Sequence, residues 1–418
     1  MLFTFSKQHL PGLFALEKTA RVVGLHKWYN ENIMIYKNEI SRLGFGCMRL
    51  PKDLEKTENM IMHALDSGIN YFDTAYIYSG NEELLGKIIE RNDCRDRMKI
   101  ATKIPNYMLK KPEDFDKYFD TQLKRLRTDH IDYYLMHMLP DVGTWDRLVD
   151  LGITDWIERK KNSGAIGHIG FSYHGGNKNF MELIDAYDWE FAQVQYNYMD
   201  ENSQAGRAGV EHAAEKGVPV FIMEPLRGGL LVDRLPGEAK ELIEKEEHGR
   251  SAAEWALKWL WDQTDVTMVL SGMNSVEMID ENVRVAENTP ENSLTDGDFE
   301  FYEKLCKSIN NSIKIGCTGC AYCMPCPFGV NIPACFRCYN SSYMDGYFHG
   351  IKEYFMITAF SKEPSYASVC RQCGKCLEHC PQSIPIPDMM KKVKRRLEVP
   401  GFKPARWFVK NKMMRPAD

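Results

Sequence analysis

The chain has 418 residues, of which 44% are hydrophobic, and a formal net charge of −5. This length suits two or three domains, and the charge favours neither nucleic acid nor a membrane surface as a partner. Residues 1–20 lack the uninterrupted apolar run of a secretory signal, and no stretch is long and apolar enough to span a bilayer. We therefore expect a cytoplasmic protein.

Eight short apolar runs along the first two thirds of the chain predict β-strands. They alternate with amphipathic patterns, which is typical of parallel strands joined by crossover helices. Eight such units favour a closed (β/α)8 TIM barrel over an open doubly wound sheet, because no Gly-x-Gly-x-x-Gly turn follows the first strand. The predicted strands are Arg42–Cys47, Ile69–Asp73, Lys99–Lys103, Ile131–His137, His168–Phe171, Phe191–Gln195, Val218–Met223 and Thr267–Leu270.

Amphipathic patterns of helical period predict the helices between and after these strands. They cover Lys56–Ser67, Glu83–Arg91, Asp114–Arg127, Trp145–Lys161, Asn177–Ala186, Gly206–Lys216, Ala252–Trp261, Val276–Ala286 and Asp296–Ser312.

The domain boundaries follow from these elements and from composition. We expect an N-terminal extension (1–33), the barrel (34–295), a linker helix (296–316), a cysteine-rich domain (317–390) and a basic tail (391–418). The tail suits either docking to an acidic partner or anionic surface, or a solvated helix.

Polar residues stand at the ends of seven predicted strands. In an α/β barrel the carboxyl ends of the strands meet at one rim, where catalytic residues gather. Seven buried polar groups at one rim are hard to explain unless they share a purpose. They are Asp73, Lys103, His137, Ser172, Gln195, Glu224 and Ser271.

Several segments at these strand ends resemble the aldo/keto reductase family over roughly residues 35 to 282. Phe72-Asp73-Thr74-Ala75 followed by Tyr78, Ala101-Thr102-Lys103, and Leu135-Met136-His137 resemble the Asp–Tyr–Lys–His tetrad of that family. Segments in the family's order also include Leu43-Gly44-Phe45-Gly46, Gly167-His168-Ile169-Gly170-Phe171-Ser172, Gln193-Val194-Gln195-Tyr196-Asn197, Glu224-Pro225-Leu226 and Glu281-Asn282.

The resemblance implies that Asp73, Tyr78, Lys103 and His137 are catalytic, and residue chemistry agrees. Tyrosine has an unperturbed pKa near ~10, and a nearby Lys103 ammonium would lower it. Asp73 can hold Lys103, while His137 can orient the substrate oxygen. Tyr78 is then the general acid in reduction and the base in oxidation. A nicotinamide must supply the hydride, because no side chain can.

The resemblance also implies nicotinamide contacts, although this part of the pattern is altered. Tyr173 stands where the family often has an Asn that contacts the carboxamide, and Met223 precedes Glu224 where an aromatic is common. The expected contacts are Ser172, Gln195, Glu224, Gly272, Glu281 and Asn282.

The stretch 271–277 bears on the choice of nicotinamide. It holds no cation and one acid, Glu277, where the family carries basic residues for the 2′-phosphate of NADP. We therefore expect NADH to be preferred over NADPH, unless Arg227 or Arg284 supplies the missing charge.

Ten of the 13 cysteines fall between Cys317 and Cys380, which in a reducing compartment indicates metal ligation. The run from Cys370 to Cys380 has the spacing of the bacterial ferredoxin motif, whose fourth Cys ligates the other cluster, and the run from Cys317 to Cys326 is one residue shorter before its Cys-Pro but otherwise alike. Paired four-cysteine zinc sites are the alternative, but zinc would leave the third Cys of each run unexplained. The expected [4Fe–4S] ligands are Cys317, Cys320, Cys323 and Cys380 for cluster one, and Cys370, Cys373, Cys376 and Cys326 for cluster two.

Five cysteines stand outside these two runs. Cys335 and Cys338 form an extra CxxC that we interpret as a bystander, with a redox or third-metal role as the alternative. Cys47, Cys94 and Cys306 are interpreted as packing residues.

Some aldo/keto reductases resemble the whole chain, with the barrel first and a ferredoxin-like module last. The first hypothesis is a nicotinamide-dependent oxidoreductase acting on a carbonyl or alcohol, whose clusters exchange electrons with a partner protein. The second is an electron-transfer or docking subunit with a non-catalytic barrel. Nicotinamides transfer two electrons whereas clusters transfer one each, so structural clusters are a further possibility under the first hypothesis.

Overall fold

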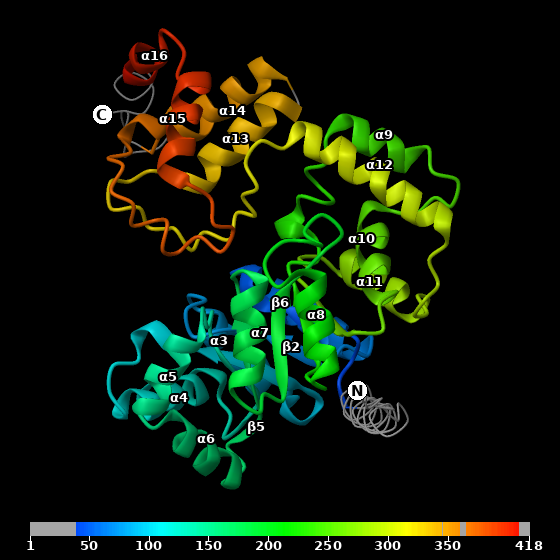
Figure 1. Ribbon diagram of the computed structural model, residues 1–418, viewed down its shortest axis with the longest axis vertical. Coiled ribbons are helices and arrows are strands. Elements are labelled where there is room, and N and C mark those ends of the chain that lie inside the picture. The colour runs from blue at the N-terminus through cyan, green and yellow to red at the C-terminus, as the bar shows by residue number, and fades with distance from the viewer. Residues whose placement is uncertain (1–38, 345, 360–364, 409–418) are drawn as a thin grey trace, which may run out of the picture. The chain divides into compact units, whose positions relative to one another are not determined.

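The computed structural model describes residues 39–344, 346–359 and 365–408 (Figure 1). They divide into two compact units. The barrel unit holds the described residues up to Val194, with Ala205–Met223 and Thr264–Ile279. The second unit holds Gln195–Gln204, Glu224–Gln263 and the described residues from Asp280 onward. The expected N-terminal extension, residues 1–33, lies outside the described residues, as does the end of the basic tail.

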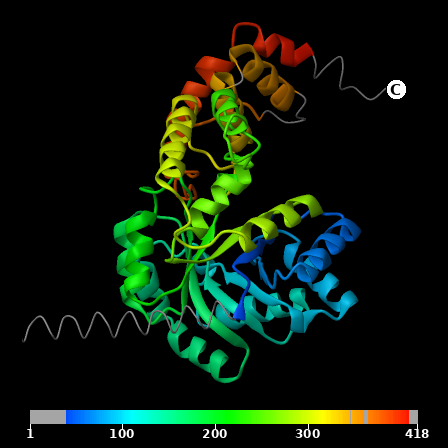
Figure 2. The ribbon, with the colours of Figure 1, turned by 90° about the vertical axis from the view of Figure 1, so that its right-hand side faces the viewer.

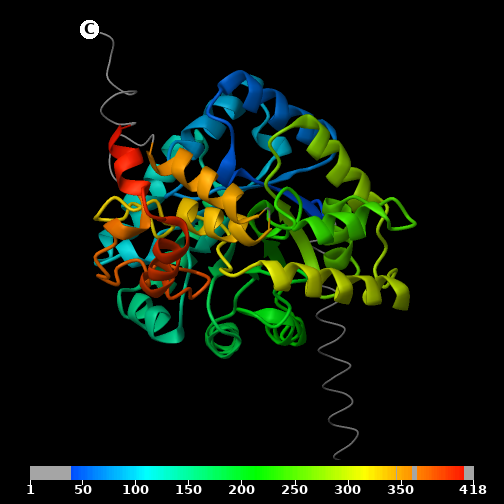
Figure 3. The same ribbon diagram turned by 90° about the horizontal axis from the view of Figure 1, so that it is seen from above.

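The barrel unit contains a closed barrel of eight strands in sequence order, β1 to β8, which confirms the predicted TIM barrel. All the strand pairs with a described register are parallel. The strands form the inner wall, and helices lie outside it (Figure 3). The strands are β1 Leu43–Gly46, β2 Tyr71–Asp73, β3 Lys99–Ile104, β4 Ile131–Met136, β5 Ile166–Tyr173, β6 Phe191–Gln195, β7 Val220–Met223 and β8 Val266–Ser271.

Helices follow the strands of the barrel unit much as predicted. The helix expected over Trp145–Lys161 is wrong as a single element. Gly152 adopts a left-handed conformation with φ 86°, which ends one helix and starts another. The helices are α2 Leu54–Asp66, α3 Asn81–Asn92, α4 Glu113–Leu126, α5 Val142–Asp150, α6 Ile153–Asn162, α7 Asn177–Ala186 and α8 Gly206–Glu215.

Aromatic side chains fill the inside of the barrel. Tyr71 meets Tyr133 edge to face with ring centroids 5.0 Å apart, and Phe191 stacks on Phe221 at 4.9 Å. All four are fully buried. Because this packed layer closes the interior, polar side chains near the carboxyl ends of the strands line a rim rather than a pore.

The second unit consists mainly of helices. The helix predicted over Asp296–Ser312 is confirmed as α12, and its N-terminus carries a capping box between Thr295 and Asp298. Helices α9 and α12 lie side by side (Figure 2). The helix α11 (Val276–Glu287) begins in the barrel unit and continues into this one. The others are α9 Gly237–Glu244, α10 Ala252–Trp261, α12 Asp296–Ser312, α13 Ile332–Met344, α14 Tyr347–Ala359, α15 Ile386–Leu397 and α16 Phe402–Phe408.

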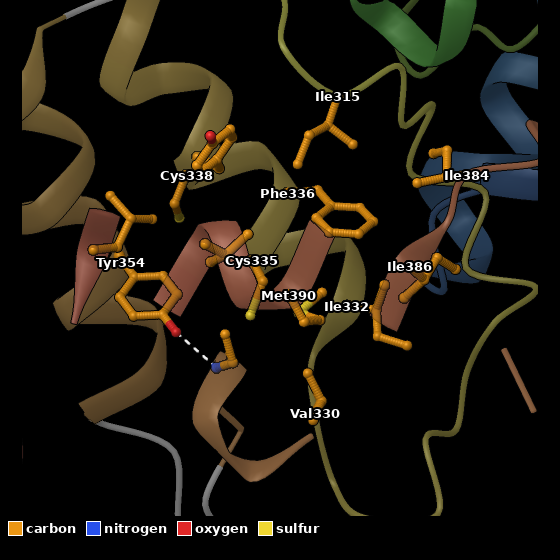
Figure 4. Close-up of a cluster of buried hydrophobic side chains, with 14 of the residues drawn as sticks. Ile315, Val330, Ile332, Cys335, Phe336, Cys338, Tyr354, Ile384, Ile386 and Met390 are labelled. Carbon is orange, nitrogen blue, oxygen red and sulfur yellow. Dashed lines mark hydrogen bonds between the residues drawn. The ribbon is translucent and has the colours of Figure 1, made fainter. Parts of the chain in front are cut away.

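Helices α13, α14 and α15 pack around an apolar core that contains Cys335 and Cys338 (Figure 4), and six further cysteines pack against this core. Tyr354 is buried there, and its hydroxyl accepts from the Ala367 N–H at 2.7 Å and donates to Glu398 at 3.0 Å. Phe336 and Met390 are also buried in this core. The cysteine-rich segment therefore folds around side chains of its own. Among the described residues, no helix is both long and apolar enough to cross a membrane.

Candidate functional site

A buried ion pair lies at the rim of the barrel. Lys103 Nζ donates to both carboxylate oxygens of Asp73 at 2.6 Å and to the Thr74 carbonyl oxygen at 2.7 Å. Lys103 is 1% exposed and Asp73 5%. Asp73 pairs with Ala101 across the sheet, and Lys103 lies two residues further along β3, so both face the interior. Burial raises the pKa of Asp73, while the Lys103 charge opposes that rise.

Tyr78 and His137 join this pair. The Lys103 ammonium lies 5.5 Å from the centre of the Tyr78 ring, and that ring meets His137 edge to face at 6.0 Å. Burial, with the nearby Lys103 charge, holds the pKa of His137 well below its usual range. At neutral pH His137 is therefore uncharged and carries one ring N–H. The structure brings together all four residues that the sequence suggests as catalytic.

Hydrogen bonds made by its own backbone hold His137 in position. Its N–H donates to the Ile104 carbonyl at 3.0 Å, and its carbonyl accepts from the Asn106 amide at 2.8 Å. The next N–H, of Met138, donates to Ser172 Oγ at 2.9 Å. Ser172, one of the expected cofactor contacts, therefore lies at the end of β5 beside the residue that follows His137.

Sequence reasoning missed three side chains at this rim. Gln193 is buried and hydrogen-bonds Asp73, while its Oε1 has no partner among the described residues. Cys47 is buried close enough to Asp73 for that carboxylate to raise the thiol pKa further, beyond the effect of burial. His174 lies near enough to lower the pKa of His137. Gln193 was detectable, because it alternates with Gln195 along β6 and so faces the same side.

The remaining expected nicotinamide contacts fall in both units. Gly272 directly follows β8 in the barrel unit, whereas Gln195, Glu224, Glu281 and Asn282 belong to the second unit. Gln195 is fully buried; its Nε2 donates to Asp200 at 2.5 Å, and its Oε1 has no partner within the described part of the chain. That carbonyl is available to an N–H donor.

The four cysteines expected at cluster one line one cavity together. Cys317, Cys320, Cys323 and Cys380 share it with apolar side chains that include Phe336. Burial raises the pKa of the Cys317, Cys320 and Cys323 thiols, and neighbouring thiols of the same set raise it further. Backbone N–H groups of Gly319 and Tyr322 hydrogen-bond the sulfurs of Cys317 and Cys320, respectively.

A second group of sulfurs matches the other expected set. Cys370, Cys326 and Cys373 are the thiols that raise the pKa of Cys376, after the larger effect of burial. Of the eight expected ligands, Cys373 is exposed and the others are partly buried. In residues 39–344, 346–359 and 365–408, no three His, Cys, Asp or Glu side chains converge tightly enough to hold a single metal ion.

The extra CxxC lies on one helix, away from solvent. Cys335 and Cys338 are both 0% exposed on α13, and burial raises the pKa of each thiol. Cys335 donates to the Ser365 carbonyl with 3.8 Å between sulfur and oxygen. Buried, protonated thiols of this kind behave as packing residues.

Comparison with known proteins matches both parts of the chain. The model of the aldo/keto reductase family matches residues 42–296, and that of the 4Fe–4S dicluster domain matches residues 316–384. A relative named uncharacterized oxidoreductase YrpG, from Bacillus subtilis, is 28% identical over 300 residues, covering 59% of this chain and 88% of the relative.

Two solved structures resemble the barrel. The aldo-keto reductase AKR11C1 from Bacillus halodurans, in its holo form, is 30% identical with a TM-score of 0.54 and covers 64% of this chain and 92% of its own. An aldo-keto reductase from Klebsiella pneumoniae in complex with NADPH shares the fold at 20% identity and a TM-score of 0.52, covering 64% of this chain and 91% of its own.

Proposed function

The chain belongs to the aldo/keto reductase family and carries a 4Fe–4S domain after the barrel, so it is an oxidoreductase, and on this premise we propose its reaction. The barrel interconverts a carbonyl and an alcohol with a nicotinamide, and two [4Fe–4S] clusters in the second unit exchange electrons with a partner. The observation that carries the proposal is the buried Lys103–Asp73 pair beside Tyr78 and His137.

Tyr78 is the proposed general acid in reduction and the base in oxidation. A lysine ammonium has three N–H donors, and three acceptor atoms surround Lys103 Nζ. Lys103 therefore acts on Tyr78 through its charge, which favours the phenolate. Asp73 holds that charge in place. His137, uncharged, donates its ring N–H to the substrate oxygen and orients it toward Tyr78.

The rim still offers hydrogen-bond partners to a nicotinamide, although its residues depart from the family pattern. A buried carbonyl without a donor is costly, and the Gln195 Oε1 is such a group. A carboxamide N–H would satisfy it, with Ser172, Glu224, Gly272, Glu281 and Asn282 as further proposed contacts. When bound, the nicotinamide supplies or accepts the hydride.

NADH is the proposed form of the nicotinamide. Glu277 is exposed in the first turn of α11, where a 2′-phosphate would meet its negative charge. The two cations that would reverse this preference, if they reached the phosphate, are both paired. Arg227 lies 3.1 Å from Asp200, and Arg284 lies 2.7 Å from Glu254. Neither is available to a phosphate without giving up a carboxylate.

The two sulfur groups fit the crossed ligand sets expected of paired [4Fe–4S] clusters. Thiols buried next to one another are unfavourable as anions unless positive charge lies among them, and iron supplies that charge. N–H donors to the sulfurs of cluster one favour thiolates in the same way. Thiolate-bound clusters also fit the reducing cytoplasm in which we propose the protein works.

Anaerobic purification tests the proposal. The protein should hold about eight iron and eight acid-labile sulfide per chain, as two [4Fe–4S] clusters require. It should then reduce at least one aldehyde or ketone of a panel with NADH or with a reduced one-electron dye, or oxidise at least one alcohol with NAD⁺. Stoichiometric zinc without sulfide would overturn the cluster assignment. Intact clusters with no turnover of any substrate would favour the electron-transfer subunit.

A further inference from the structure

A second cavity in the second unit shares a wall with the cavity of cluster one. Its volume is about 170 Å³, and Cys317 and Pro333 line both cavities. The rest of its wall comes from the segment before and within α9 and from helices α13 and α14. A molecule in this cavity would therefore lie against a proposed ligand of cluster one.

Part of the cavity wall is apolar and part is charged. Leu230 and Leu235 are buried, while Pro333 and Met344 are half-buried. Asn340 and Ser341 contribute buried polar groups. The charged lining residues are Asp233, Arg234, Lys240, Arg337 and Glu353, with His349 at an exposed position.

The balance of charge inside the cavity favours an anion. Arg337 and Glu353 neutralise each other through a 3.0 Å ion pair. Arg234 and Lys240 then face the single carboxylate of Asp233. Arg234 is half-buried in the cavity wall, where its guanidinium donates to the Gly228 carbonyl at 2.6 Å, while Lys240 is exposed to solvent.

We propose that this cavity binds a small organic anion of about one aromatic ring in direct contact with the Cys317 ligand of cluster one. An apolar cavity of ~150 Å³ holds benzene, so the volume of this cavity suits one ring with its carboxylate toward Arg234 and Lys240. The inference rests on the proposed presence of cluster one. An anion next to a cluster also lowers its reduction potential, so the ligand would tune electron transfer.

Fluorine NMR of 4-fluorobenzoate with the reduced, cluster-containing protein tests the site. A reduced [4Fe–4S] cluster is paramagnetic, so a bound probe should broaden strongly. The uncharged analogue 4-fluorobenzamide should bind more weakly. Lys240→Gln should weaken 4-fluorobenzoate binding by about tenfold, the worth of one charge-assisted hydrogen bond.

Lys245, further along the chain than Lys240, provides a matched control. Lys245 is highly exposed and paired with Glu241, outside the cavity lining, so Lys245→Gln should leave the affinity unchanged. Met344→Trp should fill the cavity from its half-buried side and abolish the broadening. Because this variant blocks the cavity by volume rather than by charge, it still tests the site if the charge variants alter the fold. Iron and sulfide assays on every variant separate loss of the cluster from loss of the site.

The outcomes are distinct. Charge-dependent broadening that Lys240→Gln weakens and Met344→Trp abolishes would support the site. Full iron and sulfide with no broadening, or with broadening that neither variant changes, would overturn it while leaving the clusters in place. Broadening lost on Arg371→Gln and Lys375→Gln instead would move the anion to the surface beside exposed Cys373.

Discussion

The barrel rim and the cysteine-rich domain differ in which ionisable side chains they place next to one another. At the rim, unlike charges are paired within the protein, as in the contact between Lys103 and Asp73. In the cysteine-rich domain, like groups are gathered: the other thiols of its set raise the pKa of Cys323, and those of the second set raise the pKa of Cys376. The rim pair therefore neutralises its charges within the protein, whereas gathered thiols become stable thiolates only when positive charge, such as that of a metal, lies among them.

The largest effect should come from breaking the cysteine-rich domain at one cysteine. If the ligand sets cross, Cys326→Ala removes a ligand of cluster two, although Cys326 lies in the first run. Iron should fall from about eight to about four per chain, with the spectrum of cluster one retained. Anaerobic iron analysis and EPR of the reduced protein measure this. Cys335→Ala is the control, because buried Cys335 lies outside both sets, and its iron should stay complete.

The next effect should come from breaking the rim pair. Lys103→Met leaves the Asp73 carboxylate buried without its cation, which should cost about 3–5 kcal/mol of barrel stability. Denaturant unfolding followed by tryptophan fluorescence measures it. Lys99→Met, on the same strand, removes a partly exposed cation that contacts Glu39 at 2.9 Å, and should cost about 0–1 kcal/mol. Equal losses of unfolding free energy in the two variants would show that the Lys103–Asp73 pair stabilises the barrel no more than a partly exposed ion pair does.

His137 gives a smaller, pH-dependent effect. Its pKa is lowered in the folded protein, so below pH ~6.5 the unfolded chain takes up a proton that the folded chain does not. Stability should therefore fall with falling pH, by up to about 1.4 kcal/mol per unit from this residue. His137→Gln should make the measured slope shallower by that amount.

The smallest effect concerns the choice of nicotinamide. Glu277→Lys exchanges a repulsive charge for an attractive one on the solvent face, so NADPH should bind about two- to fivefold more tightly, the range of an exposed ion pair. Titration of intrinsic fluorescence with NADPH and NADH measures the ratio. Glu287→Lys, exposed at the far end of the same helix, should leave it unchanged. Tighter binding of NADPH than NADH by the unaltered protein would contradict the proposed preference.

The sequence predicts the barrel well because strand patterns and polar strand ends repeat in step. Asp73, Lys103 and His137 could be named because each follows or closes an apolar run. Gln193 lies in the middle of a strand, so the only signal for it was its alternation with Gln195 along β6. The break at Gly152 was missed because the apolar pattern of α5 continues into α6.

In the cysteine-rich domain, the candidate ligands are predictable from the spacing of the cysteines alone, whereas helices α13 and α14 between the two runs were not predicted. Their patterns are weakly amphipathic, since α13 is buried on most sides. The cavity beside Cys317 was not predictable either, because its wall combines residues near 235 with residues near 340 that only the fold brings together.

The central claim is that the rim residues perform the chemistry, and turnover by Tyr78→Phe tests it most directly. The variant loses one hydroxyl and should keep the Lys103–Asp73 pair, the fold and the full iron content. Turnover of the identified substrate with NADH should fall at least about a hundredfold, the usual worth of a positioned acid. Turnover at the unaltered rate, with iron complete, would contradict the account and make the barrel a scaffold for electron transfer.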